Sequence, residues 1–316
     1  MNFNKIVFYP LFLLIFSKTN SFAQNQHEIG MVNDNDLYVS LYLDQFYTSG
    51  LELFYRKVAS TRNHIFNKKI KHFSLCQNIY NPQLSDIPEV FMQERPYAGI
   101  LHLNYTEQII YNKNILSLGV TASVTNHKSG AEMGQNFIHS FYNLDPSAGW
   151  KTQIKEKYTV GVLANYTQTL IYKEHLPFTM YWTNNTIINS IITNISSGLA
   201  FQVNFINNAL NPISNTSFFG TALQTKEEEW IKECYFGFKS FATYQIQDYT
   251  ITGTLEVNPS SKKFHLEPWT WQNDLGFYWN LEHLNLSYHV IFKTREAQEM
   301  KTKTTKYGSV QCSYKF

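Results

Sequence analysis

The feature that most constrains this chain is an alternation of apolar and polar residues with a period of two. In the clearest run, residues 284–293, one face carries Leu284, Leu286, Tyr288, Val290 and Phe292. The last ten residues repeat the pattern and end on Phe316, and a third such face occurs at 158–166. Successive side chains of a β-strand point to opposite faces, so the alternation predicts an all-β fold.

Composition narrows the class of protein further. After residue 23 no run approaches the roughly 20 consecutive apolar residues of a membrane-spanning helix, which excludes a helical membrane protein. The content of 24 Phe, 21 Tyr and 6 Trp excludes a disordered chain. Hydrophobic residues make up 43% of the sequence and charged residues 16%, yet mean hydropathy is −0.30. A soluble all-β protein, such as a periplasmic β-sandwich, and an outer-membrane β-barrel both fit this mixture.

Three observations favour the barrel. The strand-like runs approach the 9–11 residues that a tilted strand needs to cross a bilayer, and aromatic residues gather at their ends. The chain also closes a strand on the aromatic Phe316. No Pro- or Ser-rich linker divides the sequence. We therefore predict a single transmembrane antiparallel β-barrel of about 12 strands over residues 24–316.

The N-terminus has the features of a secretory signal peptide over residues 1–23. Lys5 precedes the apolar stretch 6–17, and Ser21 and Ala23 supply small residues before a predicted cleavage site at Gln24. This segment holds two of the 26 basic residues and none of the 24 acidic ones, so the mature chain carries 24 of each. A net charge of zero gives no support for nucleic-acid binding. The predicted location is the outer membrane of a Gram-negative cell, and no protein partner is predicted.

Some segments depart from simple alternation. Residues 131–144 carry Gln135 and His139 four apart, which places both on one side of a short helix in an extracellular loop. Further strand-like runs lie near 37–56, 72–80, 99–111, 115–124, 196–206, 234–247, 249–257 and 274–282. The three cysteines, Cys76, Cys234 and Cys312, are too dispersed for a disulfide framework, and isolated thiols are expected.

Polar clusters occur in a fixed order through the first half of the chain. They are Asn33-Asp34-Asn35-Asp36, Asp44 with Tyr47-Thr48-Ser49-Gly50, Gln77-Asn78-Ile79-Tyr80-Asn81-Pro82, Glu94-Arg95-Pro96-Tyr97-Ala98-Gly99, Gln135 with His139, and Gly149-Trp150-Lys151-Thr152-Gln153. No nucleophile elbow, zinc helix, P-loop or dinucleotide-binding turn is present. An Asn/Asp cluster alone is most often a turn, so it is the order of the six clusters that carries information.

This ordered set resembles the lipid A 3′-O-deacylase family, the LpxR-like outer-membrane enzymes. The resemblance extends to the final hairpin and Phe316. The sequence departs from the family pattern at Glu94, where the family usually has Asp, and in the stretch 121–134, where the family often has Gly-Pro and a Gly-rich segment.

The resemblance implies hydrolysis of the 3′-linked acyl (acyloxyacyl) chain of lipid A, the lipid anchor of lipopolysaccharide in the outer leaflet. It makes His139 the general base that activates water. It also implies that Asn35 and Asp36 hold a divalent cation, for which Ca²⁺ is expected, and that this cation stabilises the oxyanion. Thr48 and Gln135 correspond to polar positions that line the family's site, and Gln135 is placed to orient the water or the imidazole.

Other interpretations stay open at this point. Arg95 is a candidate ligand for a lipid A phosphate, but it also suits a structural role in the lumen through Glu94. Rival functions are a non-catalytic barrel with a structural or transport role, and a barrel phospholipase that acts on glycerophospholipids.

Overall fold

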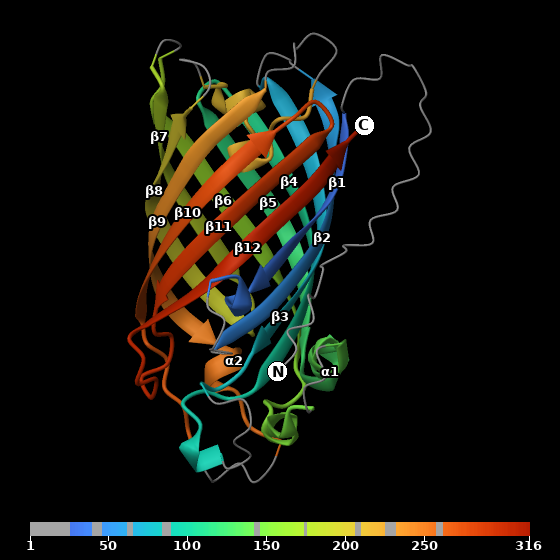
Figure 1. Ribbon diagram of the computed structural model, residues 1–316, viewed down its shortest axis with the longest axis vertical. Helices are drawn as coiled ribbons and strands as arrows, with labels where there is room; N and C mark the ends of the chain where they lie inside the picture. The colour runs from blue at the N-terminus through green and yellow to red at the C-terminus, as the bar shows by residue number, and fades with distance from the viewer. Residues whose placement is uncertain are drawn as a thin grey trace, which may run out of the picture.

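The computed structural model describes residues 26–39, 46–61, 66–83, 90–141, 146–173, 176–205, 210–224, 232–256 and 262–316, with all their side chains except those of residues 48, 60, 61, 91 and 141. These residues form a closed antiparallel barrel in which each strand pairs with the next and β12 pairs with β1 (Figure 1). The prediction of a single β-barrel of about twelve strands is confirmed. The predicted signal peptide, residues 1–23, lies outside the described residues.

The strands are β1 (His27–Asn35), β2 (Tyr47–Thr61), β3 (Lys68–Tyr80), β4 (Ala98–Tyr111), β5 (Asn114–Thr125), β6 (Tyr158–Ile171), β7 (Phe178–Ile188), β8 (Ile192–Asn204), β9 (Glu233–Asp248), β10 (Trp269–Asn280), β11 (Leu284–Thr294) and β12 (Thr304–Lys315). The helices are α1 (Ala131–Phe141) and α2 (Tyr249–Thr252). The 3-10 turns are η1 (Asp36–Tyr38), η2 (Val90–Met92), η3 (Asn126–Ser129), η4 (Ala148–Thr152), η5 (Ile213–Asn215) and η6 (Ser217–Phe219). Within the described ranges, no helix is long and apolar enough to cross a membrane.

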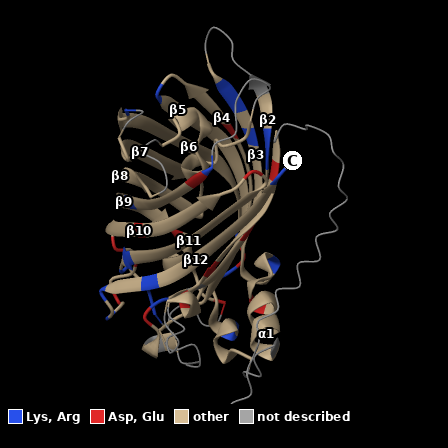
Figure 2. Ribbon diagram, turned by 45° about the horizontal axis from the view of Figure 1, so that its top comes forward, with Lys and Arg blue, Asp and Glu red and all other residues tan. Residues whose placement is uncertain are grey.

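The direction of the side chains distinguishes a membrane barrel from a soluble sandwich. In β11 the polar residues Asn285, Ser287 and His289 are buried in the lumen, whereas Tyr288 and Phe292 are exposed on the outside. Figure 2 shows few charged residues on the outer face of β8–β12 and more in the loops at the ends. A polar interior with an apolar outer band is the arrangement of an outer-membrane barrel.

Loop lengths identify the two ends of the barrel. At the end where β1 begins and β12 ends, residues 112–113 join β4 to β5 and residues 281–283 join β10 to β11. At the other end, residues 126–157 and 249–268 form much longer connections. Outer-membrane barrels have short periplasmic turns and long extracellular loops, so the end with α1 and α2 is extracellular.

A long connection fills the periplasmic end of the lumen. Within residues 210–224, which lie between β8 and β9, Leu210, Ile213, Phe218 and Leu223 pack against inward-facing side chains of the wall. The fully buried Lys68 amino group donates to the carbonyl oxygens of Thr221 and Leu223, at 3.1 and 2.6 Å. We call residues 210–224 the periplasmic plug.

The extracellular end is also packed. Side chains from four different loops and from the start of β4 meet there in one buried apolar cluster: Phe46, Ala98, Ile154, Ile251, Leu255, Phe264, Ala297 and Met300. The isolated bridges Ile154↔Leu255 and Leu266↔Ala297 connect these loops through their backbones. We call this cluster the extracellular cap.

Two of the predicted strands are wrong in part. The run 37–56 was expected to be one strand, but the chain turns after β1 and β2 begins only at Tyr47. The Asn35 side chain accepts a hydrogen bond from the Leu37 N–H at 2.8 Å, which caps η1 and ends β1.

The predicted strand 249–257 is helical at its start. Asp248 caps α2 by accepting from the Thr250 N–H at 2.8 Å, and this local bond overrides the β-branched composition of the segment. Strands β1 and β7 were not among the predicted runs. The helix predicted within 131–144 is α1, and the three cysteines are free.

Candidate active site

The described members of all six polar clusters lie at the extracellular end of one sector of the barrel, and Asp44 lies outside the described residues. They occupy the end of β1, the start of β2, the end of β3, the loop before β4, α1 and η4. Since β1 to β5 are consecutive neighbours in the wall, residues up to 120 positions apart in sequence share one stretch of the rim. Side chains far apart in the sequence therefore come together at the membrane surface.

Asn35 and Asp36 lie where β1 ends and η1 begins. The Asp36 side chain is only 2% exposed, and Asn35 is half-buried. The η1 turn packs against β12 and β2, so both residues are held against the wall rather than in a free loop.

Thr48 lies at an irregularity in β2. The register between β2 and β3 shifts between Tyr47 and Ser49, so Thr48 is an extra residue in this strand. The preceding Phe46 has a φ of 61°, which is strained for a bulky residue, and is 1% exposed within the extracellular cap. The Thr48 backbone thus enters β2 from a fixed position, and its side chain is outside the described set.

The helix α1 packs against β3 and β4 on the outside of the barrel (Figure 1). A Cβ on Gly99 would lie 2.2 Å from the Cβ of Ala131, so glycine is required for this close approach. The Gln77 amide donates to the Ser129 carbonyl at 2.7 Å and fixes the turn before the helix. Met133 and Phe137 are 76% and 72% exposed, so an apolar side of α1 is presented to the membrane interface.

Gln135 lies on the wall-facing side of α1 and is 3% exposed. Its Oε1 accepts a hydrogen bond from the indole Nε1–H of Trp150 at 2.7 Å, which fixes the orientation of the amide. Its Nε2 is buried and has no hydrogen-bond partner among the described residues. A buried unpaired donor is costly, so an acceptor that reached this amide, such as a water molecule, would stabilise it.

Trp150 therefore orients the Gln135 amide in addition to packing beneath α1. It is 1% exposed and packs with Ile79, Tyr97 and Ala131 under the helix. A Cβ at Gly149 would come within 2.1 Å of the Tyr97 ring, so the Gly-Trp pair is shaped to fit that tyrosine. The sequence contained both residues but not the hydrogen bond to Gln135.

His139 follows Gln135 by one helical turn and is half-buried. The α1 helix lies over β3, whereas Asn35 and Asp36 end β1, and β2 pairs with both strands. Neighbouring strands are about 4.8 Å apart, so β1 and β3 are separated by roughly 10 Å. The structure thus places His139 and Gln135 on one side of a short stretch of rim, with Asn35, Asp36 and the Thr48 backbone on the other.

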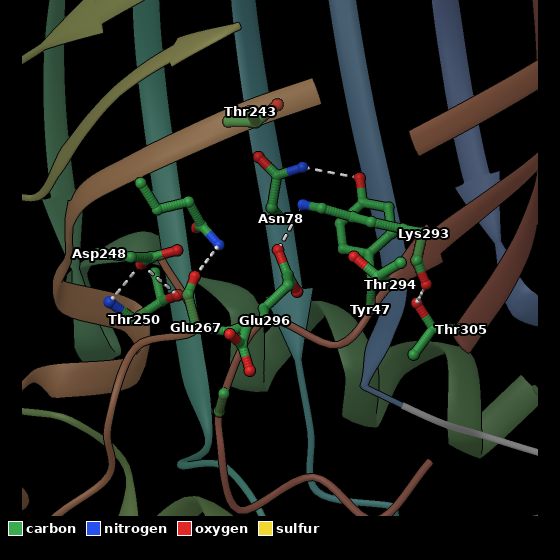
Figure 3. Close-up of polar contacts among 12 residues, drawn as sticks. Tyr47, Asn78, Thr243, Asp248, Thr250, Glu267, Lys293, Thr294, Glu296 and Thr305 are labelled. Carbon is green, nitrogen blue, oxygen red and sulfur yellow. Dashed lines mark hydrogen bonds and ion pairs between the residues drawn. The ribbon is translucent and has the colours of Figure 1, made fainter. Parts of the chain in front are cut away.

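Arg95 lies inside the protein, where it contacts other side chains, and not at a surface where it could bind substrate. It is 0% exposed; its Nη1 pairs with Glu296 at 3.2 Å, and its Nη2 donates to the Thr250 hydroxyl at 3.2 Å. The guanidinium also lies 4.3 Å from the centre of the Tyr80 ring. The partner of Arg95 is thus Glu296 and not the expected Glu94. Figure 3 shows Glu296 bound also by Lys293, with Asp248 and Thr250 nearby.

Asn35 and Asp36, the residues expected to hold a cation, suit a cation that binds mainly oxygen ligands. Asn35 and Asp36 offer an amide and a carboxylate oxygen, the donors that Ca²⁺ prefers, and Ca²⁺ takes 6–8 oxygen ligands in all. Among the described residues no group of three or more His, Cys, Asp or Glu side chains converges as a metal site. This donor set suits a cation that completes its shell with water and with oxygens of a bound lipid.

A hydrogen-bonded Ser–His–Asp chain escaped the sequence analysis. His289 Nδ1 lies 2.8 Å from Asp274 Oδ1, and His289 Nε2 lies 2.9 Å from Ser287 Oγ. Alternation at Ser287 and His289 placed them on one face, but pairing with β10 was needed to find Asp274. These three side chains face the lumen, between the periplasmic plug and the extracellular cap. Their hydrogen bonds therefore form part of the polar interior of the barrel.

An apolar groove of about 530 Å³ follows the outer wall across β3–β6. Leu75, Leu103, Val124 and Val160 line it. Leu75 is two residues below the Gln77 that holds α1, a rise of about 7 Å along the strand. The groove therefore lies on the membrane side of α1 and is suited to an acyl chain.

Comparisons with known proteins agree with this architecture. The family model described as "Outer membrane protein LpxR" matches residues 7–316. The solved structure of LpxR from Salmonella typhimurium is 16% identical and has a TM-score of 0.74, covering 92% of this chain and 100% of that one. The β domain of the Bordetella autotransporter BrkA is 8% identical with a TM-score of 0.46, over 92% and 97% of the two chains. No curated protein shows a significant sequence match. Because the family model spans nearly the whole sequence, the chain belongs to the LpxR family of outer membrane proteins.

Proposed function

We propose that this protein is an outer-membrane esterase that hydrolyses the 3′-linked acyl (acyloxyacyl) chain of lipid A. The observation that carries the proposal is the Gln135 amide, fixed by Trp150 with its donor unpaired, one helical turn from His139 at the outer face of the rim. Membership of the LpxR family supports the reaction class. The location supports a lipid substrate, because the site faces the membrane surface rather than the lumen.

In this proposal His139 acts as general base. It accepts a proton from water while the water oxygen bonds to the ester carbonyl carbon. The tetrahedral intermediate then breaks the bond between that carbon and the sugar oxygen, which takes up the proton. The products are a fatty acid and a free sugar hydroxyl.

Gln135 and Thr48 supply hydrogen bonds in the same proposal. The unpaired Gln135 donor holds either the attacking water or an oxygen of the lipid, and it needs no reorientation because Trp150 already fixes the amide. Thr48, which belongs to β2, would supply its hydrogen bond from the opposite side of the site.

Asn35 and Asp36 are the residues that would hold the divalent cation, for which we propose Ca²⁺. When bound, such a cation polarises an ester carbonyl and takes up the negative charge of the oxyanion. Burial of the Asp36 side chain against the wall keeps this carboxylate in place.

Two observations bear on the rival functions. The periplasmic plug and the extracellular cap both pack the lumen with apolar side chains, which disfavours a transport pore. A phospholipase would use the same chemistry on a smaller lipid. Incubation of the purified protein with lipid A and, separately, with labelled glycerophospholipid distinguishes the two.

The direct test is mass spectrometry of lipid A from Gram-negative cells with and without the expressed protein. We expect a species lighter by the 3′-linked acyl group. Unchanged lipid A in cells whose membranes contain the folded barrel would refute the assigned substrate.

Removal of the carboxylate at Asp36 is predicted to abolish cation dependence. The variant Asp36→Asn should lose at least about 10²-fold in activity, since a Lewis-acid contribution of several kcal/mol is lost. A Ca²⁺ chelator should lower wild-type activity to a similar level and have little further effect on Asp36→Asn. Glu299→Gln removes a carboxylate from the same rim and should retain both activity and sensitivity to the chelator. A wild type indifferent to chelation would contradict the cation proposal.

Obstruction of the groove below α1 is predicted to slow the reaction without unfolding the barrel. Val160 is 80% exposed on the outer wall, so Val160→Trp fills the groove and clashes with no core residue. We expect kcat/KM to fall about tenfold, the equivalent of roughly 1.4 kcal/mol of lost acyl-chain contact. Val203→Trp, on the outer face of β8, is the matched control and should behave as wild type. Equal rates for the two variants would show that the groove does not hold the acyl chain.

A further inference from the structure

A second groove lies on the outer wall, on the far side of the barrel from α1. It has a volume of about 630 Å³ and is lined by residues of β9, β10 and β11 and by the loop between β11 and β12. In the ring of twelve, four strands lie in either direction between the pair β3 and β4, which carries α1, and the pair β9 and β10. The two grooves are therefore on opposite sides and can be occupied together.

The part of this groove that faces the membrane is apolar. Trp269 and Trp271 alternate outward along β10 and are 62% and 50% exposed, and Ala242 of the paired strand β9 lies opposite Trp271. The Trp269 ring lies against Tyr244, with centroids 4.9 Å apart. The Trp271 indole donates to the Ser240 hydroxyl at 3.0 Å, which fixes the ring. The two indoles and Ala242 thus give the groove an apolar lining that is suited to a hydrocarbon chain.

The extracellular rim of the groove carries positive charge. Arg295 uses Nε and Nη2 to bind one oxygen of Glu267, both at 3.0 Å. A guanidinium has five N–H donors, so the Nη1 side remains for another acceptor. Lys303 is exposed and forms no ion pair within the part of the chain that the structure describes. The Arg295 N–H donates to the Lys303 carbonyl at 3.0 Å, which keeps the two residues adjacent across the neck of their loop.

An aromatic girdle explains tryptophans at this depth, but it explains neither the groove nor the paired cations at its rim. Together, Arg295, Lys303 and Glu267 leave a net positive charge at the level of the outer-leaflet headgroups. A phosphate monoester carries a charge of about −1.5 to −2 near neutral pH and accepts bidentate hydrogen bonds from Arg. A zwitterionic phospholipid would bring its ammonium group close to the same cations.

We propose that this groove is a second, non-catalytic binding site for a phosphorylated glycolipid of the lipid A class. An acyl chain lies between Trp269 and Trp271, and a sugar phosphate is bound by Arg295 and Lys303. The inference does not depend on whether the site near α1 hydrolyses lipid A, because the two sites share no residue.

The test is native mass spectrometry of the full-length protein in detergent with increasing amounts of defined lipids. The probes are bisphosphorylated lipid A that already lacks its 3′-linked chains, the same lipid without phosphates, phosphatidylglycerol and phosphatidylethanolamine. We expect wild type to bind one more molecule of bisphosphorylated lipid A than the double variant Arg295→Gln/Lys303→Gln, or to bind that molecule at least tenfold more tightly. The expected preference is for bisphosphorylated lipid A over the other three probes.

Two controls make the result specific. Lys113→Gln/Lys173→Gln removes the same charge from exposed lysines at the periplasmic end and should leave binding unchanged. Trp269→Ala should weaken binding while the charged rim stays intact. Deacylation should proceed at the wild-type rate in all three variants. Equal binding of the phosphate-free lipid, equal binding of phosphatidylglycerol, or no change in Arg295→Gln/Lys303→Gln would each overturn the proposal.

Discussion

The variant His139→Ala is expected to reduce release of the 3′-linked acyl chain from lipid A by about 10²- to 10⁴-fold, the usual contribution of a general base. His139 is half-buried on a helix outside the barrel, so its loss removes no lumen contact and leaves the wall intact. The measurement is the rate of fatty-acid release from lipid A by purified protein. Folding is monitored in parallel by heat-modifiable migration in gels.

The control for this experiment is Ser287→Ala. The Ser287–His289–Asp274 chain has the hydrogen-bond order of a serine hydrolase, so it is the alternative place for ester hydrolysis in this molecule. We expect Ser287→Ala to keep wild-type activity because the packed lumen gives a lipid no route to the serine. Activity that survives in His139→Ala but disappears in Ser287→Ala would move the catalytic site from the rim to the lumen.

The variant Arg95→Met is expected to lower the free energy of unfolding by about 3 kcal/mol, the lower end of the range for breaking a buried ion pair. Glu296 would lose its contact with the guanidinium but keep Lys293, and the Thr250 hydroxyl and Tyr80 ring would lose the same partner. The measurement is urea unfolding of the barrel followed by tryptophan fluorescence. Lys301→Met, a change at an 87% exposed side chain of the same end, should alter stability by less than about 0.5 kcal/mol.

The pH dependence of wild-type stability provides a second measurement of the same ion pair. Burial alone would raise the pKa of Glu296, but attraction by Lys293 and Arg95 outweighs it, so the pKa is lowered. A lowered pKa stabilises the folded state at pH values above the unfolded pKa, about 4.5, and this stabilisation is lost as the pH falls through the folded value. Arg95→Met should weaken this acid-induced loss.

Arg95→Met also separates the two roles considered for this residue. If Arg95 bound a lipid phosphate, the variant would keep its stability and show a raised KM. Full burial of the side chain predicts the opposite result, with loss of stability accompanying any loss of activity.

The sequence was sufficient for the fold class because alternation reports directly on strands. It failed where local hydrogen bonds override composition. Leu37 and Tyr38 look like the start of a strand, but the Asn35 cap turns them into η1. The periplasmic plug could not be inferred either, since its apolar residues have no regular period and are buried only by inward-facing side chains from distant strands.

For the candidate site, the order of the polar clusters selected residues that the structure places in one sector of the rim, but it did not predict which side chains contact one another. Gln135 and His139 were paired by helical spacing alone. The orientation of the Gln135 amide depends on Trp150, 15 positions later, and the partner of Arg95 is 201 positions away. The first contact depends on how the connection between β5 and β6 folds back on itself, and the second depends on barrel closure, so neither follows from a local sequence pattern.

The packed interior has a consequence for the cell that makes this protein. A barrel whose described residues pack apolar side chains at both ends is expected to add no conductance to the membrane, so many copies could be present without leakage of ions, nutrients or toxic solutes. If the chemistry takes place on the outer wall, both the trimmed lipid and the fatty acid are released into the leaflet from which the substrate came. Such a cell could change the charge and fluidity of its surface while the permeability barrier stays closed.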